Sequence, residues 1–305
     1  MDHPISFPPG GADPLDLDVI WNGGIDPQEP PAQVHHLNEH TVVIRQSLNT
    51  SAEAPFVVLL FGNESAFLLD TGDGRDPDVW PLRQLVDELI AGWLTDHPRQ
   101  GYRLLIAHTH AHRDHTAGDV QFAGRPDTTL VKADLDCVRE FFGLGDWPDG
   151  SATLDLGGRT LVLIPSPGHH QTAISVLDPY TGCLFTGDTV YPGRLYVPDM
   201  PAFLATMDRL AELGDSGDVS LVLGCHIELD GHGRDYPLGA RAHPEEESPF
   251  MPPDRLRAVR DGARQIAGSP GVHAFDGFVI YNGNRFRDQL GLLARSWMSR
   301  LRGQP

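Results

Sequence analysis

The 305-residue sequence is poor in cysteine. It has three cysteines, Cys137, Cys183 and Cys225, which is an odd number and too few for a disulfide framework. Each lies in an apolar context, so we expect buried free thiols.

The sequence also lacks long apolar runs. It has no stretch of about 18 apolar residues, the length that a transmembrane helix needs. Residues 1–10 have neither the basic nor the apolar part of a secretory signal. These absences predict a cytoplasmic protein with no membrane contact.

Basic residues are scarce relative to acidic ones. Lys and Arg number 23 against 42 Asp and Glu, which gives a formal net charge of −19. This charge opposes binding to nucleic acids and anionic membranes at long range. We therefore expect a small-molecule substrate, and the sequence leaves a homodimer open.

Length and hydropathy patterns indicate one main domain. With 40% hydrophobic residues, the chain can form one core of about 250 residues plus appendages. Residues 1–37 read as an irregular lead-in, and residues 38–305 as the domain, with a loop insertion at about 228–252 and C-terminal helices. Strands are predicted within 41–45, 56–61, 66–70, 104–108, 129–132, 160–164, 173–177 and 219–223, and helices within 82–94, 133–142, 200–213, 253–267 and 286–301.

The most informative motif follows the apolar run 102–108. His110, His112, Asp114 and His115 form an H-x-H-x-D-H cluster, and alternate residues of an extended loop point the same way. The cluster can therefore supply ligands to two neighbouring metal ions. A surface histidine run or a tag would explain neither the interleaved Asp nor the internal position.

Three further candidate ligands follow strand-like segments. They are His169 after a turn, Asp188 after a Gly, and His226 after an apolar run. Taken singly, each is weak evidence, because a lone His after a turn is more often an ordinary surface or hydrogen-bonded residue than a ligand. All lie at predicted strand ends, as the first cluster does.

In this order, and with Phe67-Leu-Leu-Asp70-Thr-Gly upstream, these motifs resemble the metallo-β-lactamase superfamily over about residues 38–230. The resemblance implies an α/β fold, the four-layer αβ/βα sandwich. It assigns His110, His112 and His169 to a first metal, and Asp114, His115 and His226 to a second, with Asp188 bridging both. Asp70 would brace the metal loop. Because His115 and Asp188 depart from the true β-lactamases, the glyoxalase II and lactonase branch fits better.

Such a site implies a hydrolase. Two divalent ions lower the pKa of a shared water, so a metal-bridging hydroxide can attack an ester, lactone or thioester at neutral pH. Zinc is the expected ion, with iron and manganese as alternatives. Asp114 could deliver a proton only if it is sufficiently free of metal. A flavodiiron-like oxidoreductase and a non-catalytic metal-binding protein are the alternative functions.

Substrate contacts are expected on the loop after Asp188. Tyr191 resembles the phenol that N-acyl homoserine lactonases place over the substrate carbonyl, although the ring could instead pack the loop. Arg194 could bind a substrate carboxylate or form an ordinary ion pair.

His108 and His170 are expected beside the ligands rather than among them. Six other histidines have no recognisable ligand spacing: His35, His36, His40, His232, His243 and His273.

Overall fold

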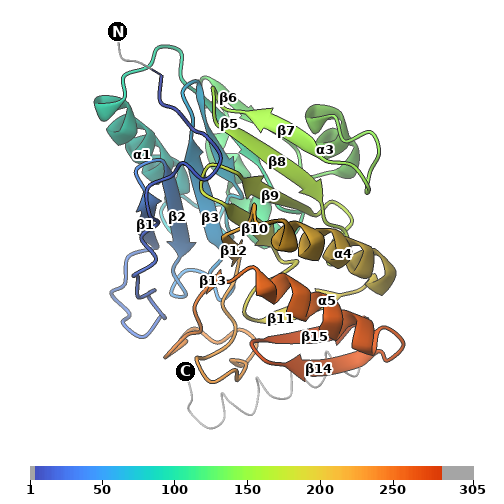
Figure 1. Ribbon diagram of the computed structural model, residues 1–305. Coiled ribbons are helices and arrows are strands. Elements are labelled where there is room, and N and C mark those ends of the chain that lie inside the picture. Colours follow the sequence, from blue (N-terminus) through green and yellow to red (C-terminus); the bar gives the residue numbers. More distant parts are fainter. Residues whose placement is uncertain (1–3, 284–305) are drawn as a thin grey trace.

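The computed structural model describes residues 4–283 and shows two six-stranded sheets packed face to face, with helices outside them (Figure 1). In the first sheet the strand order is β1 (Ala32–Asn38), β2 (Thr41–Gln46), β3 (Phe56–Phe61), β4 (Ser65–Leu69), β5 (Arg103–Ala107) and β6 (Thr128–Leu130). Strands β1 to β4 form an antiparallel meander, and β4, β5 and β6 are parallel.

The second sheet has the order β13 (Phe250–Met251), β12 (Leu221–Gly224), β10 (Cys183–Gly187), β9 (Ile174–Asp178), β8 (Thr160–Pro165) and β7 (Ala152–Asp155). A third sheet of three strands has the order β11 (Arg194–Val197), β15 (Phe278–Asn282) and β14 (Gly271–Phe275). The helices are α1 (Leu82–Asp96), α2 (Arg113–Thr116), the 3₁₀ helix η1 (Ala117–Phe122), α3 (Leu135–Phe142), α4 (Met200–Ser216) and α5 (Asp254–Ile266).

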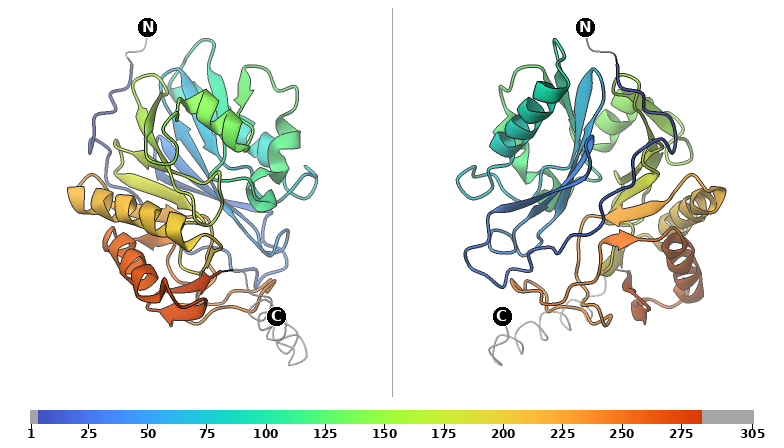
Figure 2. Two further views of the ribbon diagram at one scale, coloured as in Figure 1. Left: turned by 90° about the vertical axis from the view of Figure 1, so that its right-hand side faces the viewer. Right: turned by 60° about the vertical axis from the view of Figure 1, so that its left-hand side comes forward.

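The layers follow from strands that are apolar on both faces. Successive side chains of a strand point to opposite faces. Val43 and Val58 therefore lie in the core between the sheets, while Val42 and Val57 pack with residues of α1. On the other side, α4 and α5 lie side by side and share a core with β9, β10 and β12 (Figure 2). This arrangement is the predicted αβ/βα sandwich.

Most of the predicted elements are present. The meander 41–70 corresponds to β2–β4, and the predicted helices from 82 to 267 correspond to α1, α3, α4 and α5. The lead-in prediction is wrong at its end, because residues 32–38 pair with β2 as strand β1. Sequence analysis also missed β7, β11, β13, β14 and β15, and β13 lies within the segment predicted as a loop insertion at about 228–252. The helix expected at 286–301 lies outside the described residues.

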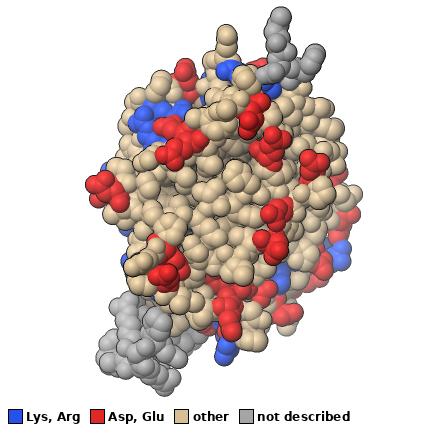
Figure 3. Space-filling view, turned by 90° about the vertical axis from the view of Figure 1, so that its left-hand side faces the viewer, with Lys and Arg blue, Asp and Glu red and all other residues tan. Residues whose placement is uncertain are grey.

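Surface charge follows the composition. On the face shown in Figure 3, acidic side chains are spread among uncharged ones, and basic side chains are fewer. Among the described helices, none has both the length and the apolar character needed to cross a bilayer.

Candidate metal centre

The candidate ligands meet because several strands end at one edge of the sandwich. Strands β4 and β5 are parallel, and β8, β10 and β12 run in a common direction within the second sheet. The segments that leave their C-terminal ends carry every predicted ligand: His110, His112, Asp114, His115, His169, Asp188 and His226.

Three histidines and one carboxylate form the first ligand group. His112 Nδ1 lies 2.8 Å from His110 Nε2 and 3.0 Å from His169 Nε2. Asp188 Oδ2 is 3.4 Å from His169 Nε2 and 3.8 Å from His110 Nε2. All four ligand atoms lie within 4.8 Å of one another, a separation that allows one ion to contact them all.

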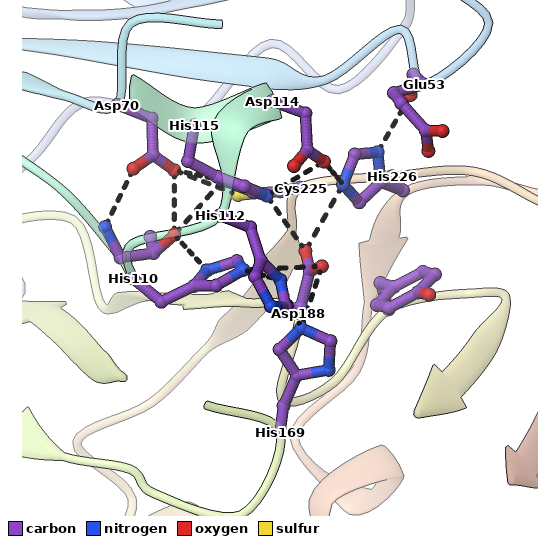
Figure 4. A network of polar contacts seen from close by, with 12 residues as sticks. Glu53, Asp70, His110, His112, Asp114, His115, His169, Asp188, Cys225 and His226 are labelled. Carbon is purple, nitrogen blue, oxygen red and sulfur yellow. Dashed lines mark hydrogen bonds and ion pairs between the residues drawn. The ribbon is translucent and has the colours of Figure 1, made fainter. Parts of the chain in front are cut away.

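The second ligand group uses the other oxygen of Asp188. Asp188 Oδ1 is 3.2 Å from His226 Nε2 and 3.5 Å from His115 Nε2. Asp114 Oδ2 lies 3.3 and 3.4 Å from the same two nitrogens. Asp188 thus stands between the two groups (Figure 4).

Backbone carbonyls determine which ring nitrogen of two histidines faces the centre. His169 Nδ1 lies 2.8 Å from the carbonyl oxygen of Tyr196, and His226 Nδ1 lies 2.8 Å from that of Glu53. A carbonyl can only accept a hydrogen bond, so each Nδ1 carries the proton. The Nε2 lone pair of each neutral ring is therefore directed at the ligand group, as metal binding requires.

Asp70 orients His115 from behind, as the resemblance implies. Its Oδ2 lies 2.9 Å from His115 Nδ1, and Thr109 donates to both carboxylate oxygens from its backbone nitrogen and its hydroxyl, at 2.7 and 2.8 Å. The thiol of Cys225 adds a contact at 3.4 Å. Asp70 has φ of +70°, an uncommon conformation for a non-glycine residue. The backbone strain is consistent with a functional position.

A glycine permits the close approach of Asp188. Gly187 has φ of +54°, and a Cβ placed there would lie 2.6 Å from Cβ of Thr109. Any larger residue would clash and adopt an unfavourable backbone conformation. The Thr-Gly-Asp sequence therefore brings β10 against the loop that follows β5.

Protonation in the site reflects crowding of like groups. Burial and then the neighbouring His169 lower the pKa of His112 to about 4, and burial followed by His115 holds the pKa of His110 well below its usual value. Burial raises the pKa of Asp188, but the surrounding histidines outweigh it and hold that pKa well below the usual range. Burial also lowers the pKa values of His115 and His226, but the neighbouring carboxylates outweigh it and hold both well above the usual value. A metal ion binds the neutral imidazole, so it would displace those protons.

Two buried atoms of the candidate ligands have no hydrogen-bond partner in the described part of the chain. They are His115 Nε2 and Asp188 Oδ1, both of the second group. An unpartnered buried nitrogen and carboxylate oxygen would cost free energy in an apolar interior. A bound cation would satisfy both, so the donor set fits the metal ions that the fold implies.

The side chains of Tyr191 and Arg194 are engaged within the protein. The Tyr191 hydroxyl donates to the carbonyl of Arg194 at 2.5 Å, lies 3.0 Å from Glu228 Oε2, and its ring packs edge-on against His226. Arg194 donates to Glu228 Oε1 and to the carbonyl of Tyr236, both at 2.6 Å. These contacts favour loop packing as the role of Tyr191 and an ordinary ion pair as the role of Arg194, over direct recognition of a substrate by either residue.

Among the other histidines, His108 contacts Asp119 at 2.8 Å and His170 contacts Thr172 at 2.9 Å, so neither joins a ligand group.

Sequence analysis missed a third cluster of Glu39, His40 and His97. Trp93 donates its indole N–H to His40 Nδ1, which leaves the proton of the neutral ring on Nε2, the atom facing the cluster. That tautomer disfavours a metal there.

The sequence matches known proteins over most of its described length. The family model of the metallo-beta-lactamase superfamily matches residues 52–220. The acyl-coenzyme A thioesterase MBLAC2 of Bos taurus is 29% identical over 235 residues, which cover 65% of this chain and 81% of that protein. A hydroxyacylglutathione hydrolase of Synechococcus sp. is 27% identical over 147 residues, 47% of this chain and 58% of that protein.

Solved structures share the fold at low sequence identity. A metallo-beta-lactamase from Pontibacter korlensis superposes with a TM-score of 0.50 and 16% identity, covering 76% of this chain and 99% of that one. One from Erythrobacter litoralis gives 0.51 and 17%, covering 78% and 98%. At these identities the likeness extends to the fold alone.

Proposed function

The chain belongs to the metallo-beta-lactamase superfamily, and from this membership we propose that it is a dinuclear metal-dependent hydrolase that cleaves thioesters. The observation that carries the proposal is the pair of ligand groups joined by the two oxygens of Asp188.

Each ion would have its own set of ligands. His110, His112 and His169 would hold one ion, and Asp114, His115 and His226 the other, with Asp188 contacting both. When bound, two divalent ions polarise a carbonyl oxygen and lower the pKa of a shared water toward about 7. We propose zinc because the donors are mainly imidazoles.

The surrounding residues hold this donor set rigid. Asp70 and Thr109 fix the ring of His115, while the carbonyls of Tyr196 and Glu53 fix the tautomers of His169 and His226. Preorganised ligands of this kind need no rearrangement as charge develops in the reaction.

The state of Asp114 favours a leaving group that needs no proton. Its Oδ2 lies 3.3 and 3.4 Å from Nε2 of His115 and His226 in the second ligand group, and a carboxylate binds a metal ion in its ionised form. An ionised Asp114 cannot protonate a leaving amine or alkoxide. A thiol has a pKa of about 8.5 and departs as a thiolate, so thioesters suit the site better than amides or simple esters.

The relatives point to the same bond. One is named for acyl-coenzyme A thioesters and another for hydroxyacylglutathione. Together with the unprotonated Asp114, these names support a thioester within the broader group of esters, lactones and thioesters.

The test is a set of matched substrates. A thioester, an oxyester and a lactone carrying the same acyl chain should be offered to the zinc-loaded protein, and the thioester should give the largest kcat/KM. His169→Gln should lower that value at least 100-fold, as expected for loss of a ligand. His170→Gln is the adjacent control and should retain activity. Preference for the oxyester or lactone, or equal activity of the two variants, would contradict the proposal.

A further inference from the structure

A pocket of about 520 Å³ lies next to the second ligand group and is not used by the proposed reaction. Three arginines from separate segments line it: Arg75 follows β4, Arg113 begins α2, and Arg241 belongs to the segment between β12 and β13. Given the proposed function, we infer that this pocket is the subsite for the anionic end of the thiol half of the substrate.

Two residues that line the pocket connect it to the metal centre. Arg113 stands in the chain between the candidate ligands His112 and Asp114. Glu53 also lines the pocket, and its carbonyl accepts the Nδ1 proton of His226 (Figure 4). The pocket and the second ligand group are therefore neighbours through Glu53 and Arg113.

Two of the three guanidinium groups form no ion pair among the described residues, although three carboxylates, of Glu53, Asp73 and Asp76, also line the pocket. Arg241 donates to the carbonyl oxygens of Leu48 and Asn49 at 3.1 Å. Within residues 4–283, neither Arg241 nor Arg75 forms an ion pair with a carboxylate. Their charges are thus available to a ligand.

The third arginine is only weakly paired. Arg113 lies 3.4 Å from Asp73, and 77% of its side chain is exposed. Asp73 already accepts from the hydroxyl of Ser51, and Asp76, also in the pocket, accepts from the backbone nitrogen of Asp78. Of the three acidic residues that line the pocket, Asp73 and Asp76 therefore each accept one local hydrogen bond.

The overall charge makes such a subsite useful. A protein with a formal net charge of −19 repels an anionic substrate at long range. Local guanidinium groups offset this repulsion, because their planar donors match carboxylate and phosphate oxygens. The anion can be a carboxylate, as in a glutathione thioester, or a phosphate, as in a coenzyme A thioester.

The kinetic test compares three thioesters of one acyl group: the coenzyme A thioester, the glutathione thioester and the neutral N-acetylcysteamine thioester. The measured quantity is the ratio of kcat/KM for each anionic substrate to that for the neutral one. Arg75→Gln and Arg241→Gln should each lower this ratio about tenfold or more for whichever anionic thioester the wild type prefers. The change should lie mainly in KM, because each variant removes charged hydrogen bonds to the anion.

The matched control is Arg103→Gln. Arg103 is 64% exposed and pairs with the exposed Glu64, and it begins β5 at the end of the strand opposite the metal centre. This variant should leave the ratio unchanged. An unchanged ratio in both Arg75→Gln and Arg241→Gln, or a wild-type protein that favours the neutral thioester, would overturn the inference.

A binding measurement separates this inference from the proposed function. Adenosine 3′,5′-bisphosphate and S-methylglutathione carry the two kinds of anion but no free thiol and no thioester. Calorimetry with the zinc-loaded protein should show binding of one of them, weakened tenfold or more by Arg241→Gln, and the preferred probe identifies phosphate or carboxylate. If no thioester is hydrolysed but a probe binds in this manner, the proposed function fails and the anion subsite stands. If neither probe binds, the subsite is refuted whatever the activity.

Discussion

Removing the hydroxyl of Tyr191 distinguishes a packing role from a catalytic one. The hydroxyl donates to the carbonyl of Arg194 and lies near Glu228. In Tyr191→Phe the ring still fills its site against His226, so no large cavity forms. Glu228 Oε2 keeps the backbone N–H of Arg194 at 2.7 Å. The main loss is one buried hydrogen bond, worth about 1 to 2 kcal/mol.

The expected result is therefore a less stable protein with nearly normal turnover. Urea unfolding should show a decrease of about 1 to 2 kcal/mol in the free energy of unfolding. The control is Tyr102→Phe, which removes a phenol hydrogen bond to the carbonyl of Gly62 far from the centre. Metal content should not change. If Tyr191 donates to the oxyanion instead, kcat should fall about 100- to 1,000-fold, and such a fall at full metal content would refute our reasoning.

Two further predictions concern buried groups away from the centre. Arg159 and Asp178 form a buried ion pair at 2.6 Å. In urea unfolding, Arg159→Met should lower the free energy of unfolding by about 3 to 5 kcal/mol, because a buried carboxylate loses its counter-charge. A decrease below about 1 kcal/mol would show that the pair is dispensable. Burial lowers the pKa of His40 to about 4, so the unfolded chain binds a proton that the folded protein does not between about pH 6.5 and 4. Wild-type stability should fall relative to His40→Gln by about 1 kcal/mol from pH 7.5 to 5.5, and a constant difference would contradict the shifted pKa.

The elements that sequence analysis predicted well are those with a strong local pattern. Strands β2 to β4 alternate between two buried faces, so every residue is buried and most are apolar. Strand β1 reads AQVHHLN, with polar residues on a partly exposed edge, and follows a segment rich in Pro and Gly. Its sequence alone did not distinguish it from the lead-in; its pairing with β2 does.

The ligand candidates were predictable because each marks the end of a strand, and strand ends meet at one edge of the sandwich. Other features of the site depend on atoms that leave no trace in the sequence. The carbonyl of Glu53 that orients His226 belongs to the backbone, and any residue could supply it. The direction of the Tyr191 hydroxyl depends on Glu228, 37 residues away, so its two possible roles could not be separated.

The metal content of the purified protein tests the central claim most directly. After reconstitution with zinc and removal of the excess, elemental analysis of the wild type should give close to two ions per chain, because the two ligand groups share only Asp188. Asp188→Ala removes one ligand from each group and should lower the zinc content while circular dichroism shows a retained fold. A wild type that holds one ion or none, or an Asp188→Ala variant that keeps both ions with equal affinity, would contradict the dinuclear centre.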